Sequence, residues 1–319
     1  MTEHQTRLAI VAKEDNGCRL DIVLAKLFPD YSRSQLSQWL KQGMITIDGL
    51  HKKPKDKVIG GEQIIFCEKI LPRDAQVALT AENLSLDIVF EDEFLLVLNK
   101  PAGLVVHPGA GNFEHTLVHG ILFHHPYAHH LPRAGIVHRL DKDTTGLLIV
   151  AKTLAAHTQL IRQMQAREIH RCYMALVQGR VSVAGRIETN YGRHPKNRLK
   201  MAVCTQGKEA VTDYTIKKIY KNHTLLDVTL HTGRTHQIRV HMAHIKHPVV
   251  GDPLYGVRGL RADGLSDTLR QRLSIFQRQA LHAYTLTLLH PILQYELTLT
   301  APLPDDFQML LTALEHDLA

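Results

Sequence analysis

The chain has 319 residues, of which 44% are hydrophobic and 22% are charged, and this composition is typical of a globular protein long enough for two domains. It contains no apolar run of about 18 residues, which excludes a transmembrane helix, and its start, MTEHQTRLAI, lacks the pattern of a signal peptide. The four cysteines are widely spaced and form no CxxC motif, so we expect a reduced, cytoplasmic protein without a disulfide framework.

Positive charge is concentrated in one part of the chain. There are 38 Lys and Arg residues against 31 Asp and Glu residues, a net charge of +7, and residues 162–200 alone hold nine basic and two acidic residues. That segment accounts for the whole excess. Phosphate contacts require clustered Lys and Arg side chains, so the pattern suits a nucleic acid partner. A solvated basic surface without a ligand would give the same pattern.

Residues 17–67 have the pattern of a small separate domain. Apolar residues at helical spacing predict two helices, the second within SRSQLSQWLKQG. Ser32 and Gln35 form a predicted capping box for it, and Gly43 suits its C-terminal cap. The strand in MITIDG ends in an Asp-Gly turn, which predicts a hairpin through the basic HKKPKDK to the strand-like EQIIF. The apolar positions of the two helices are Leu20, Val23, Leu24, Leu27, Leu36, Trp39 and Leu40.

This order of two helices followed by a basic hairpin resembles the S4 RNA-binding domain. The RLD at Arg19–Asp21 and the SRS at Ser32–Ser34 match the pattern of that family. The resemblance implies that lysines of the hairpin hold an RNA backbone. The lysines concerned are Lys52, Lys53, Lys55 and Lys57. An accessory domain without a ligand is the alternative.

A linker at 68–84, which contains a proline and lacks periodicity, precedes a predicted α+β domain at 85–319. Two short β-rich runs are separated by Pro101-Ala102-Gly103, and GLLIVAKT predicts a further strand. Thr153 is expected to cap a helix marked by Ala156, Leu160 and Met164. More strands are expected at CYMALVQG, VTDYTIKKI, LLDVTLHTG and LTLTAP. Many strands with few helices predict a mixed, largely antiparallel central sheet with flanking helices.

Several common site types do not match this sequence. There is no GxxxxGK[ST], no strand–GxGxxG–helix and no GxSxG motif, which argues against a phosphate loop and a serine hydrolase. The closest histidine group, at 236, 241, 244 and 247, lacks the i,i+4 pair and the Glu of a zinc-binding helix. The hypothesis of a metal-dependent hydrolase is supported only by the 22 histidines, and we expect no metal site.

The strongest candidate site lies in GIVHRLDKDTTGLLIVAKT. Arg139, Asp141 and Asp143 are spaced by two, so on an extended backbone they share one face. Arg239 interrupts the apolar QIRV within the similarly alternating segment 231–256, so we expect it to face inward. A buried carboxylate needs a cationic partner to stay ionised, and an Asp–Arg pair in a cleft suits a nucleophile or base. The alternative is a cap or a plain ion pair of Arg139 with Asp143.

Five blocks resemble the RluA-type pseudouridine synthases. The blocks are EDEFLLVLNKPAGLVVHP, HRLDKDTTGLLIVAKT, REIHRCYMALVQG, TGRTHQIRVHMAHIKHPVVGD and LHAYTLTLLHP. They span about residues 85–305, and the S4-like domain in front completes the layout of one subgroup. Lys246 and the His-Arg-Cys at 170–172 depart from the usual pattern. A further string, GRHPKNRLKMAV, points to members that act on a hairpin loop of large-subunit rRNA.

The resemblance implies a pseudouridine synthase fold, a reaction and the residues that perform it. Uridine within RNA would be cut at N1–C1′, turned and rejoined through C5. Asp141 would attack C1′ or remove a proton from C2′, and Arg239 would keep that carboxylate ionised and oriented. Tyr173 would take the proton from C5, with help from a neighbouring cation. Arg139 would enter the space left by a flipped-out uridine.

Partners and cofactors follow from the same resemblance. The reaction has no net redox change, so we expect no cofactor. The partner would be large-subunit rRNA, free or in an assembling 50S particle, with Arg193 and Arg198 among the basic residues that hold it. We expect a cytoplasmic monomer without membrane attachment. A non-catalytic RNA-binding or ribosome-assembly factor of the same fold is the alternative, against which the intact Asp141, Tyr173 and Arg239 argue.

Overall fold

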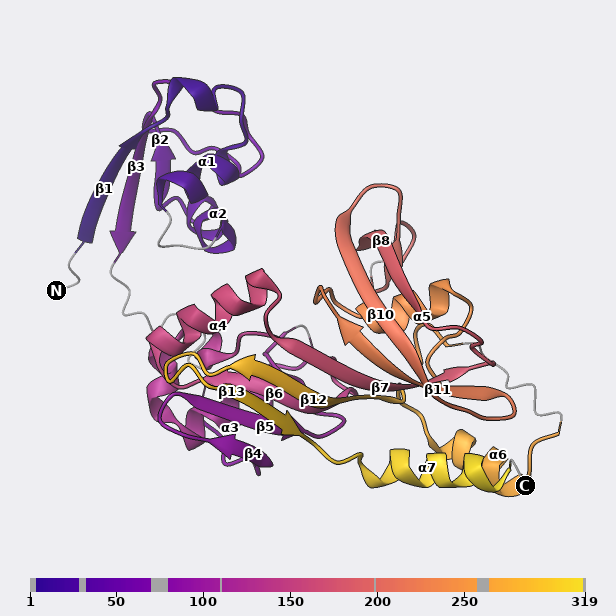
Figure 1. Ribbon diagram of the computed structural model, residues 1–319. Helices are drawn as coiled ribbons and strands as arrows, with labels where there is room; N and C mark the ends of the chain where they lie inside the picture. The colour runs from indigo at the N-terminus through magenta and orange to yellow at the C-terminus, as the bar shows by residue number, and fades with distance from the viewer. Residues whose placement is uncertain are drawn as a thin grey trace. The chain divides into compact units, whose positions relative to one another are not determined.

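The computed structural model of the chain describes residues 4–28, 33–69, 80–109, 111–197, 199–256 and 264–317. The chain divides into two compact units, Met1–Ala78 and Leu79–Ala319, each with its own sheet and helices (Figure 1). Among the helices of the described residues, none combines the length and the apolar character needed to cross a membrane.

The first unit is a three-stranded antiparallel sheet, in the order β1-β3-β2, with two helices. Its elements are β1 (His4–Ile10), η1 (Lys13–Asp15), α1 (Leu20–Leu27), α2 (Arg33–Lys41), β2 (Ile45–Ile47) and β3 (Gln63–Lys69). The predicted helices and hairpin strands are confirmed, and the Asp48-Gly49 turn has φ values of 48° and 74°, as a tight hairpin turn requires. β1 lies before residue 17 and is an addition to the predicted pattern. The side chains of the predicted Ser32–Gln35 capping box lie outside the described residues.

The RLD and SRS motifs join the two helices of this unit. Asp21, in the first turn of α1, accepts hydrogen bonds from Arg19 at 3.1 and 2.9 Å and from Arg33, at the start of α2, at 2.7 Å. The bonds from Arg19 and then Arg33 lower the pKa of Asp21, although burial opposes the shift. Both motifs therefore have a structural role in holding the starts of α1 and α2 together.

The second unit is built on one ten-stranded sheet, in the order β4-β5-β6-β12-β7-β11-β10-β8-β9, with β13 also paired to β12. Its strands are β4 (Ile88–Glu91), β5 (Leu95–Lys100), β6 (Thr145–Ala151), β7 (His170–Gln178), β8 (Gly185–Arg193), β9 (Met201–Val203), β10 (Lys208–Ile219), β11 (His223–Leu230), β12 (Leu281–Leu289) and β13 (Glu296–Thr300). Among the named strands, β6 and β12 pair in parallel and the other pairs are antiparallel. The predicted α+β class with a largely antiparallel mixed sheet is confirmed.

Helices cover both faces of this sheet. They are α3 (Leu117–His124), η3 (Pro126–His130), η4 (Pro132–Gly135), α4 (Leu154–Ala166), α5 (Gln237–His244), α6 (Asp267–Ile275) and α7 (Asp305–His316). Alternate residues of β6 enter two cores: Leu148 lies in the core that includes α3, and Ile149 in the core that includes α4. The predicted cap of α4 is confirmed, because the Thr153 hydroxyl accepts from the Ala156 amide at 3.2 Å.

A glycine lets β6 approach its parallel neighbour closely. Gly146 has a φ of 109°, and a Cβ at this position would lie 2.1 Å from the carbonyl oxygen of Ala283 on β12. A side chain is therefore excluded both by the backbone conformation and by the space. The glycine of TTGLL thus fixes where β6 begins, directly after the loop that carries Asp141.

Two predicted extended segments are wrong. The run before Pro101 forms the two strands β4 and β5, but the run after Gly103 forms none, because its carbonyls at Val105 and Val106 accept from the first amides of α3. The segment 231–256 contains the helix α5 and does not alternate as a strand. Gln237 to Met242 of α5 are all buried, so no polar face reveals the helical period.

Candidate active site

Asp141 lies in the loop between η4 and β6, at a pocket that also receives side chains from β7 and α5. The structure brings together the three predicted catalytic residues and Arg139 in this pocket. Its polar lining is Arg139, Asp141, Thr144, Tyr173, Arg234, His236, Gln237 and Arg239. The chain turns directly after Asp141, with Thr144 N–H donating to the Asp141 carbonyl at 3.1 Å. The expected shared face of Arg139, Asp141 and Asp143 therefore ends at Asp141, since Lys142 and Asp143 form the turn.

Arg239 is the predicted cationic partner of Asp141. Its Nη1 donates to Asp141 Oδ2 at 3.0 Å, and the two side chains are 4% and 16% exposed. The second oxygen, Oδ1, is 3.9 Å from His236 Nε2. One carboxylate oxygen is therefore fixed by a guanidinium, and the other accepts no hydrogen bond from the described residues.

Asp252 completes this pair and was not assigned a role from the sequence. Its carboxylate accepts from Arg239 Nε at 2.7 Å and Nη2 at 2.9 Å, and from the amides of Leu254 and Tyr255. Burial opposes ionisation of both partners. The hydrogen bonds and opposite charges of the pair outweigh it, so the pKa of Arg239 is raised and that of Asp252 is lowered. Asp252 ends the block that contains Arg239, so a buried carboxylate for Arg239 could have been sought there.

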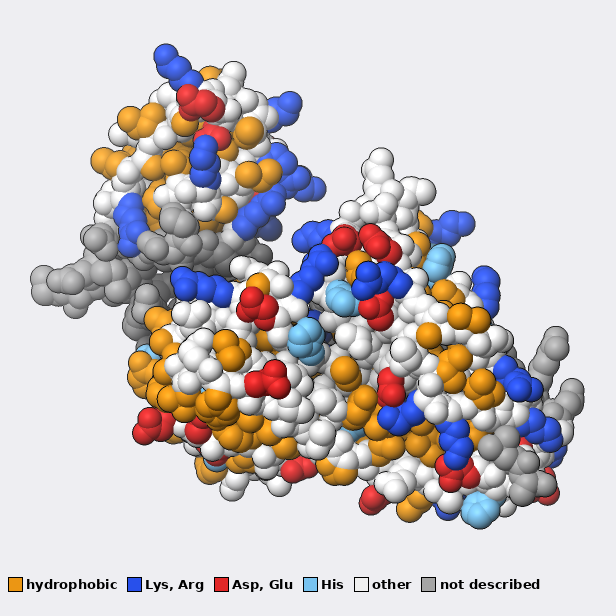
Figure 2. Space-filling model, in the orientation of Figure 1, with side chains coloured by type: hydrophobic (Ala, Val, Ile, Leu, Met, Phe, Trp, Pro, Cys, Tyr) orange, Lys and Arg blue, Asp and Glu red, His pale blue; other side chains and the backbone are white. Residues whose placement is uncertain are grey.

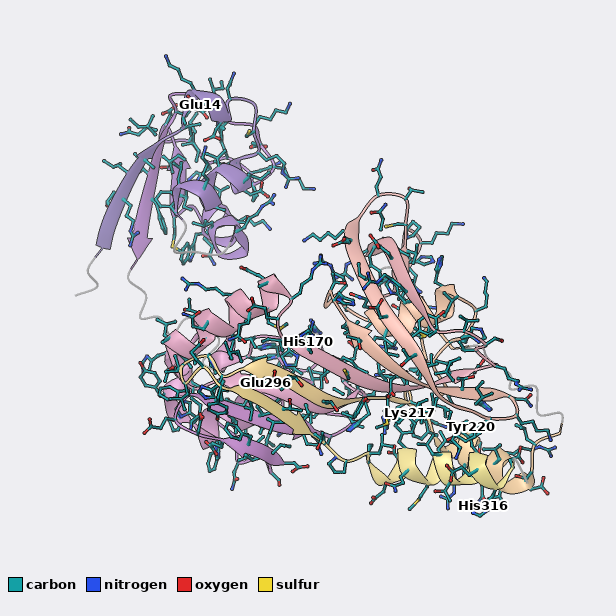
Figure 3. All side chains as sticks on the ribbon, viewed as in Figure 1. Glu14, His170, Lys217, Tyr220, Glu296 and His316 are labelled. Atoms are coloured by element: carbon teal, nitrogen blue, oxygen red, sulfur yellow. The ribbon has the colours of Figure 1, made fainter. Side chains whose placement is uncertain are left out.

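Tyr173 reaches the pocket from β7, whose first residue, His170, is labelled in Figure 3. Burial and the charge of Asp141 raise the pKa of the Tyr173 hydroxyl, while Arg171 opposes the shift. The phenol is therefore protonated in the resting pocket. Within the described part of the chain, no hydrogen bond occupies this hydroxyl, so it is available to a bound molecule.

The loop that carries Asp141 is anchored residue by residue. Lys100, which is 1% exposed, donates from Nζ to the carbonyls of Lys142, Pro101 and Leu104 at 2.7–2.9 Å. Arg278 Nη1 donates to the Asp143 carbonyl at 3.3 Å, and its guanidinium also bonds Asp306. Neither anchor was predicted, although a lysine directly after the apolar LLVLN is a signal for a buried charge.

His236 is a further pocket residue that the sequence did not single out. It precedes α5 and has a left-handed backbone, with φ 59° and ψ 19°. Burial lowers the pKa of its imidazole, and Arg239 and Arg139 add to the shift while Asp141 opposes it. The ring is therefore neutral at neutral pH.

Arg139 differs from its neighbours in being exposed. Across the described ranges it forms no ion pair, so the alternative of a plain Arg139–Asp143 pair is not found. A free guanidinium at the rim of a pocket is suited to contact a ligand that enters from outside.

The other candidate RNA-binding residues that the structure describes lie on the surface. Lys53 and Lys55 are exposed on the hairpin loop of the first unit, whereas Lys52 is paired with Glu62. Figure 2 shows several Lys and Arg side chains on the surface of this unit. In the second unit Arg193 is exposed at the end of β8, and Arg198 lies outside the described residues.

The histidines do not form a metal site in the described structure. Among the residues that can be described, no group of three or more His, Cys, Asp or Glu side chains is arranged to hold a metal ion. His241, for example, is buried in α5 and bonds the hydroxyls of Thr212 and Thr189 at 2.8 and 3.0 Å.

Family models match both units of the chain. The model described as RNA pseudouridylate synthase matches residues 94–244, and the model described as S4 domain matches residues 18–64. The first range contains Asp141, Tyr173 and Arg239, and the second contains the basic hairpin of the first unit.

Curated relatives extend the similarity over nearly the whole chain. Three proteins named ribosomal large subunit pseudouridine synthase D are 48% (Xanthomonas campestris pv. campestris), 49% (Pseudomonas aeruginosa) and 46% (Escherichia coli O157:H7) identical. The matches cover 98%, 99% and 99% of this chain and 94%, 98% and 97% of the relatives.

Two solved human structures share the fold. They are RNA pseudouridylate synthase domain containing 1, with a TM-score of 0.54 and 26% identity, and RNA pseudouridylate synthase domain containing 4, with 0.55 and 27%. The matches cover 70% and 72% of this chain and 86% and 93% of those chains.

Proposed function

The chain belongs to the RNA pseudouridylate synthase family, and we propose that it isomerises specific uridines of large-subunit ribosomal RNA. The substrate class is supported by relatives named for the large ribosomal subunit, which match along nearly the whole chain. The observation that carries the proposal is the pair of Asp141 and Arg239. One carboxylate oxygen is held at 3.0 Å by a buried guanidinium, and the other lies 3.9 Å from His236 Nε2 in the same pocket.

Asp141 is the residue we assign to the cleavage of the N1–C1′ bond. Arg239 holds Oδ2, so Oδ1 is left to attack C1′ or to remove a proton from C2′, and both routes stay open. Asp252 fixes the far side of the guanidinium with two bonds. Because a bidentate pair restricts the guanidinium plane, Arg239 presents Nη1 to Asp141 in one orientation.

Tyr173 is assigned to the removal of the C5 proton after the base has been rejoined. Tyr173 lines the same pocket as Asp141, which supports a position near the base of a nucleotide bound there. The raised pKa of the phenol means that the phenolate, once formed, is a strong base. Arg171, whose charge opposes that rise, is the neighbouring cation that would stabilise the phenolate.

Arg139 is assigned to base flipping. A uridine inside a helix must leave its stack to reach Asp141, at a cost of about a few kcal/mol. The exposed guanidinium of Arg139 at the pocket rim can stack on the neighbouring bases and offset part of that cost.

The RNA backbone is assigned to basic residues of both units. Lys53, Lys55, Arg193 and Arg198 would each contact a phosphate, which contributes affinity and salt dependence more than sequence choice. Lys52 would contribute less, since its charge is already paired with Glu62. We propose that the protein acts as a monomer on ribosomal RNA in the cytoplasm.

Release of tritium from C5 tests this function directly. Large-subunit rRNA transcribed with C5-tritiated uridine should lose tritium to water when the protein is added, without added metal or cofactor. The Asp141→Asn variant should bind the RNA and release at least a thousandfold less, since the carboxylate is required for the first step. Asp143→Asn is the matched control two residues away, and it should retain most of the activity.

The same experiment separates the alternatives. Tight binding without release from the wild type would support a non-catalytic ribosome-assembly factor. Cleavage of the strand that EDTA abolishes would support a metal-dependent hydrolase. Full activity of Asp141→Asn would remove that residue from the mechanism. Comparing free rRNA with assembling particles, and mapping pseudouridines in cells that lack the protein, would identify the substrate form and the target uridine.

A further inference from the structure

His236 is held in an unusual conformation at the pocket. Its φ of 59° and ψ of 19° lie in the left-handed region, which residues other than glycine rarely occupy, although His is tolerated there more often than most. Strained residues of this kind cluster at functional sites. The side chain is 18% exposed and lines the pocket beside Asp141 and Tyr173.

The Tyr255 hydroxyl favours one tautomer of His236. The Tyr255 oxygen lies 2.9 Å from His236 Nδ1 and accepts the amide N–H of Met201 at 2.8 Å. With the Met201 N–H directed at that oxygen, the phenolic proton is free to bond Nδ1. A neutral imidazole that accepts at Nδ1 carries its own proton on Nε2, and in this tautomer His236 presents an N–H donor to the pocket.

That donor faces a free carboxylate oxygen. His236 Nε2 is 3.9 Å from Asp141 Oδ1, which is too far for a hydrogen bond. Oδ1 accepts no hydrogen bond from the described residues. An atom beside both groups could accept from Nε2–H and donate to Oδ1. A hydroxyl does both, whereas the carbonyl oxygens of uracil can only accept.

The geometry points to the 2′-hydroxyl of the target uridine as that group, and we propose that His236 is a further catalytic residue that donates to it; this rests on the proposed function. The base and the 2′-hydroxyl lie on opposite faces of the ribose. A carboxylate that attacks C1′ opposite the base therefore approaches from the face of the 2′-hydroxyl. A carboxylate that takes a proton from C2′ approaches from the other face, because that hydrogen lies on the same face as the base. Attack at C1′ therefore places this hydroxyl beside Oδ1, so the contact belongs to that route, and it would distinguish RNA from DNA.

A pair of substrates and a pair of variants test the contact. The substrates are a synthetic RNA hairpin with the mapped target uridine and the same hairpin with 2′-deoxyuridine at that position. His236→Asn keeps a residue that tolerates the left-handed backbone but does not reach the position of Nε2. We expect it to lower the single-turnover rate on the ribose hairpin about tenfold, the worth of one hydrogen bond, and to leave the rate on the deoxy hairpin within about twofold. His236→Gln, whose amide N–H reaches farther, should recover most of the loss.

Binding supplies a readout that does not require turnover of the deoxy hairpin. In the Asp141→Asn protein, the ribose hairpin should bind several-fold more tightly than the deoxy hairpin, and addition of His236→Asn should abolish this difference. His244→Ala, on an exposed position of the same helix, is the control and should change neither rate nor affinity.

The outcomes distinguish this inference from the proposed function. Equal losses of rate on the two hairpins, or a ribose preference that survives His236→Asn, would overturn the contact with the 2′-hydroxyl. A wild-type protein that fails to release tritium from the ribose hairpin and from rRNA would overturn the proposed function itself.

Discussion

At the scale of single residues, the site depends on a few buried charges that hold one another. Arg239 is shared between two carboxylates, Asp141 on the pocket side and Asp252 on the core side. Lys100 holds the loop of Asp141 by three carbonyls. Burying a charge without a partner costs several kcal/mol, so loss of either support should be visible in both stability and activity.

Asp252→Asn tests the support of Arg239. The substitution leaves a buried guanidinium with one carboxylate, so we expect a loss of about 2–4 kcal/mol in the free energy of unfolding. The tritium-release rate should fall about a hundredfold, because Nη1 is no longer held against Asp141. Urea unfolding and the rRNA assay measure the two effects. Asp213→Asn, which breaks an exposed bidentate pair with Arg186, should cost less than about 1 kcal/mol. Unchanged activity of Asp252→Asn would show that Arg239 needs no second carboxylate.

Lys100 should make stability depend on pH. Burial lowers its pKa from 10.5 to about 7, while Asp143 and Asp141 oppose the shift. Between pH 7 and 10.5 the unfolded chain therefore binds more protons than the folded chain, and stability rises with pH in that window. Relative to Lys100→Met, the wild-type free energy of unfolding should increase by about 2 kcal/mol from pH 7 to 9. Lys218→Met, at an exposed position, is the matched control. A constant difference for Lys100→Met would mean that the folded protein keeps this lysine charged.

At the scale of elements, local sequence patterns predicted an element correctly where one of its faces is exposed. α4 was predicted from its cap and from Ala156, Leu160 and Met164, because its other face is polar and reveals the helical period. α5 was predicted as extended, since residues 237–242 are buried on every side and carry no such contrast. The strands β8 and β12 received no separate prediction. A buried segment is defined by its tertiary partners, which the sequence does not display.

Gly146→Ala tests the close contact of β6 with β12. A methyl group here would lie 2.1 Å from the Ala283 carbonyl oxygen on a backbone with φ 109°, and neither the strand nor the backbone angle can adjust cheaply. We expect a loss of more than about 3 kcal/mol, seen as a large drop in Tm or as insoluble protein. Gly109→Ala, which would meet nothing within 4 Å, should change Tm by only a few degrees. A Gly146→Ala protein with wild-type Tm would contradict the described approach of the two strands.

At the scale of the whole molecule, the sequence predicted the class of fold and the chemistry better than the order of the strands in the sheet. The Asp141–Arg239 pair could be expected from the need of a buried carboxylate for a cation, although the two residues are 98 positions apart. The roles of Tyr173 and Arg139 came from family resemblance alone. The strand order could not be predicted, because the parallel pairing of β6 with β12 joins segments more than 130 residues apart. Nothing local encodes such a contact.

Charge distribution leads to a prediction about RNA binding by the whole chain. If Lys53 and Lys55 contact phosphates, each should contribute to the number of counterions released, and loss of one contact lowers the slope of log affinity against log salt by about 0.7–0.9. Lys53→Gln with Lys55→Gln should therefore weaken binding of large-subunit rRNA and reduce the salt slope by about 1.5. The single-turnover rate at saturating protein should stay unchanged, since neither lysine lines the pocket of Asp141.

Lys217→Gln is the matched control for charge. Lys217, labelled in Figure 3, lies on β10 and is paired with Asp227 of the neighbouring strand at 3.2 Å, so its charge is already neutralised within the protein. This variant should leave the salt slope within about 0.3 of the wild-type value. If the Lys53 and Lys55 substitutions changed affinity but not the slope, the two lysines would act through the fold of the first unit. If they changed neither, the phosphate contacts of this chain would have to come from the second unit, where Arg193 is the first residue to substitute.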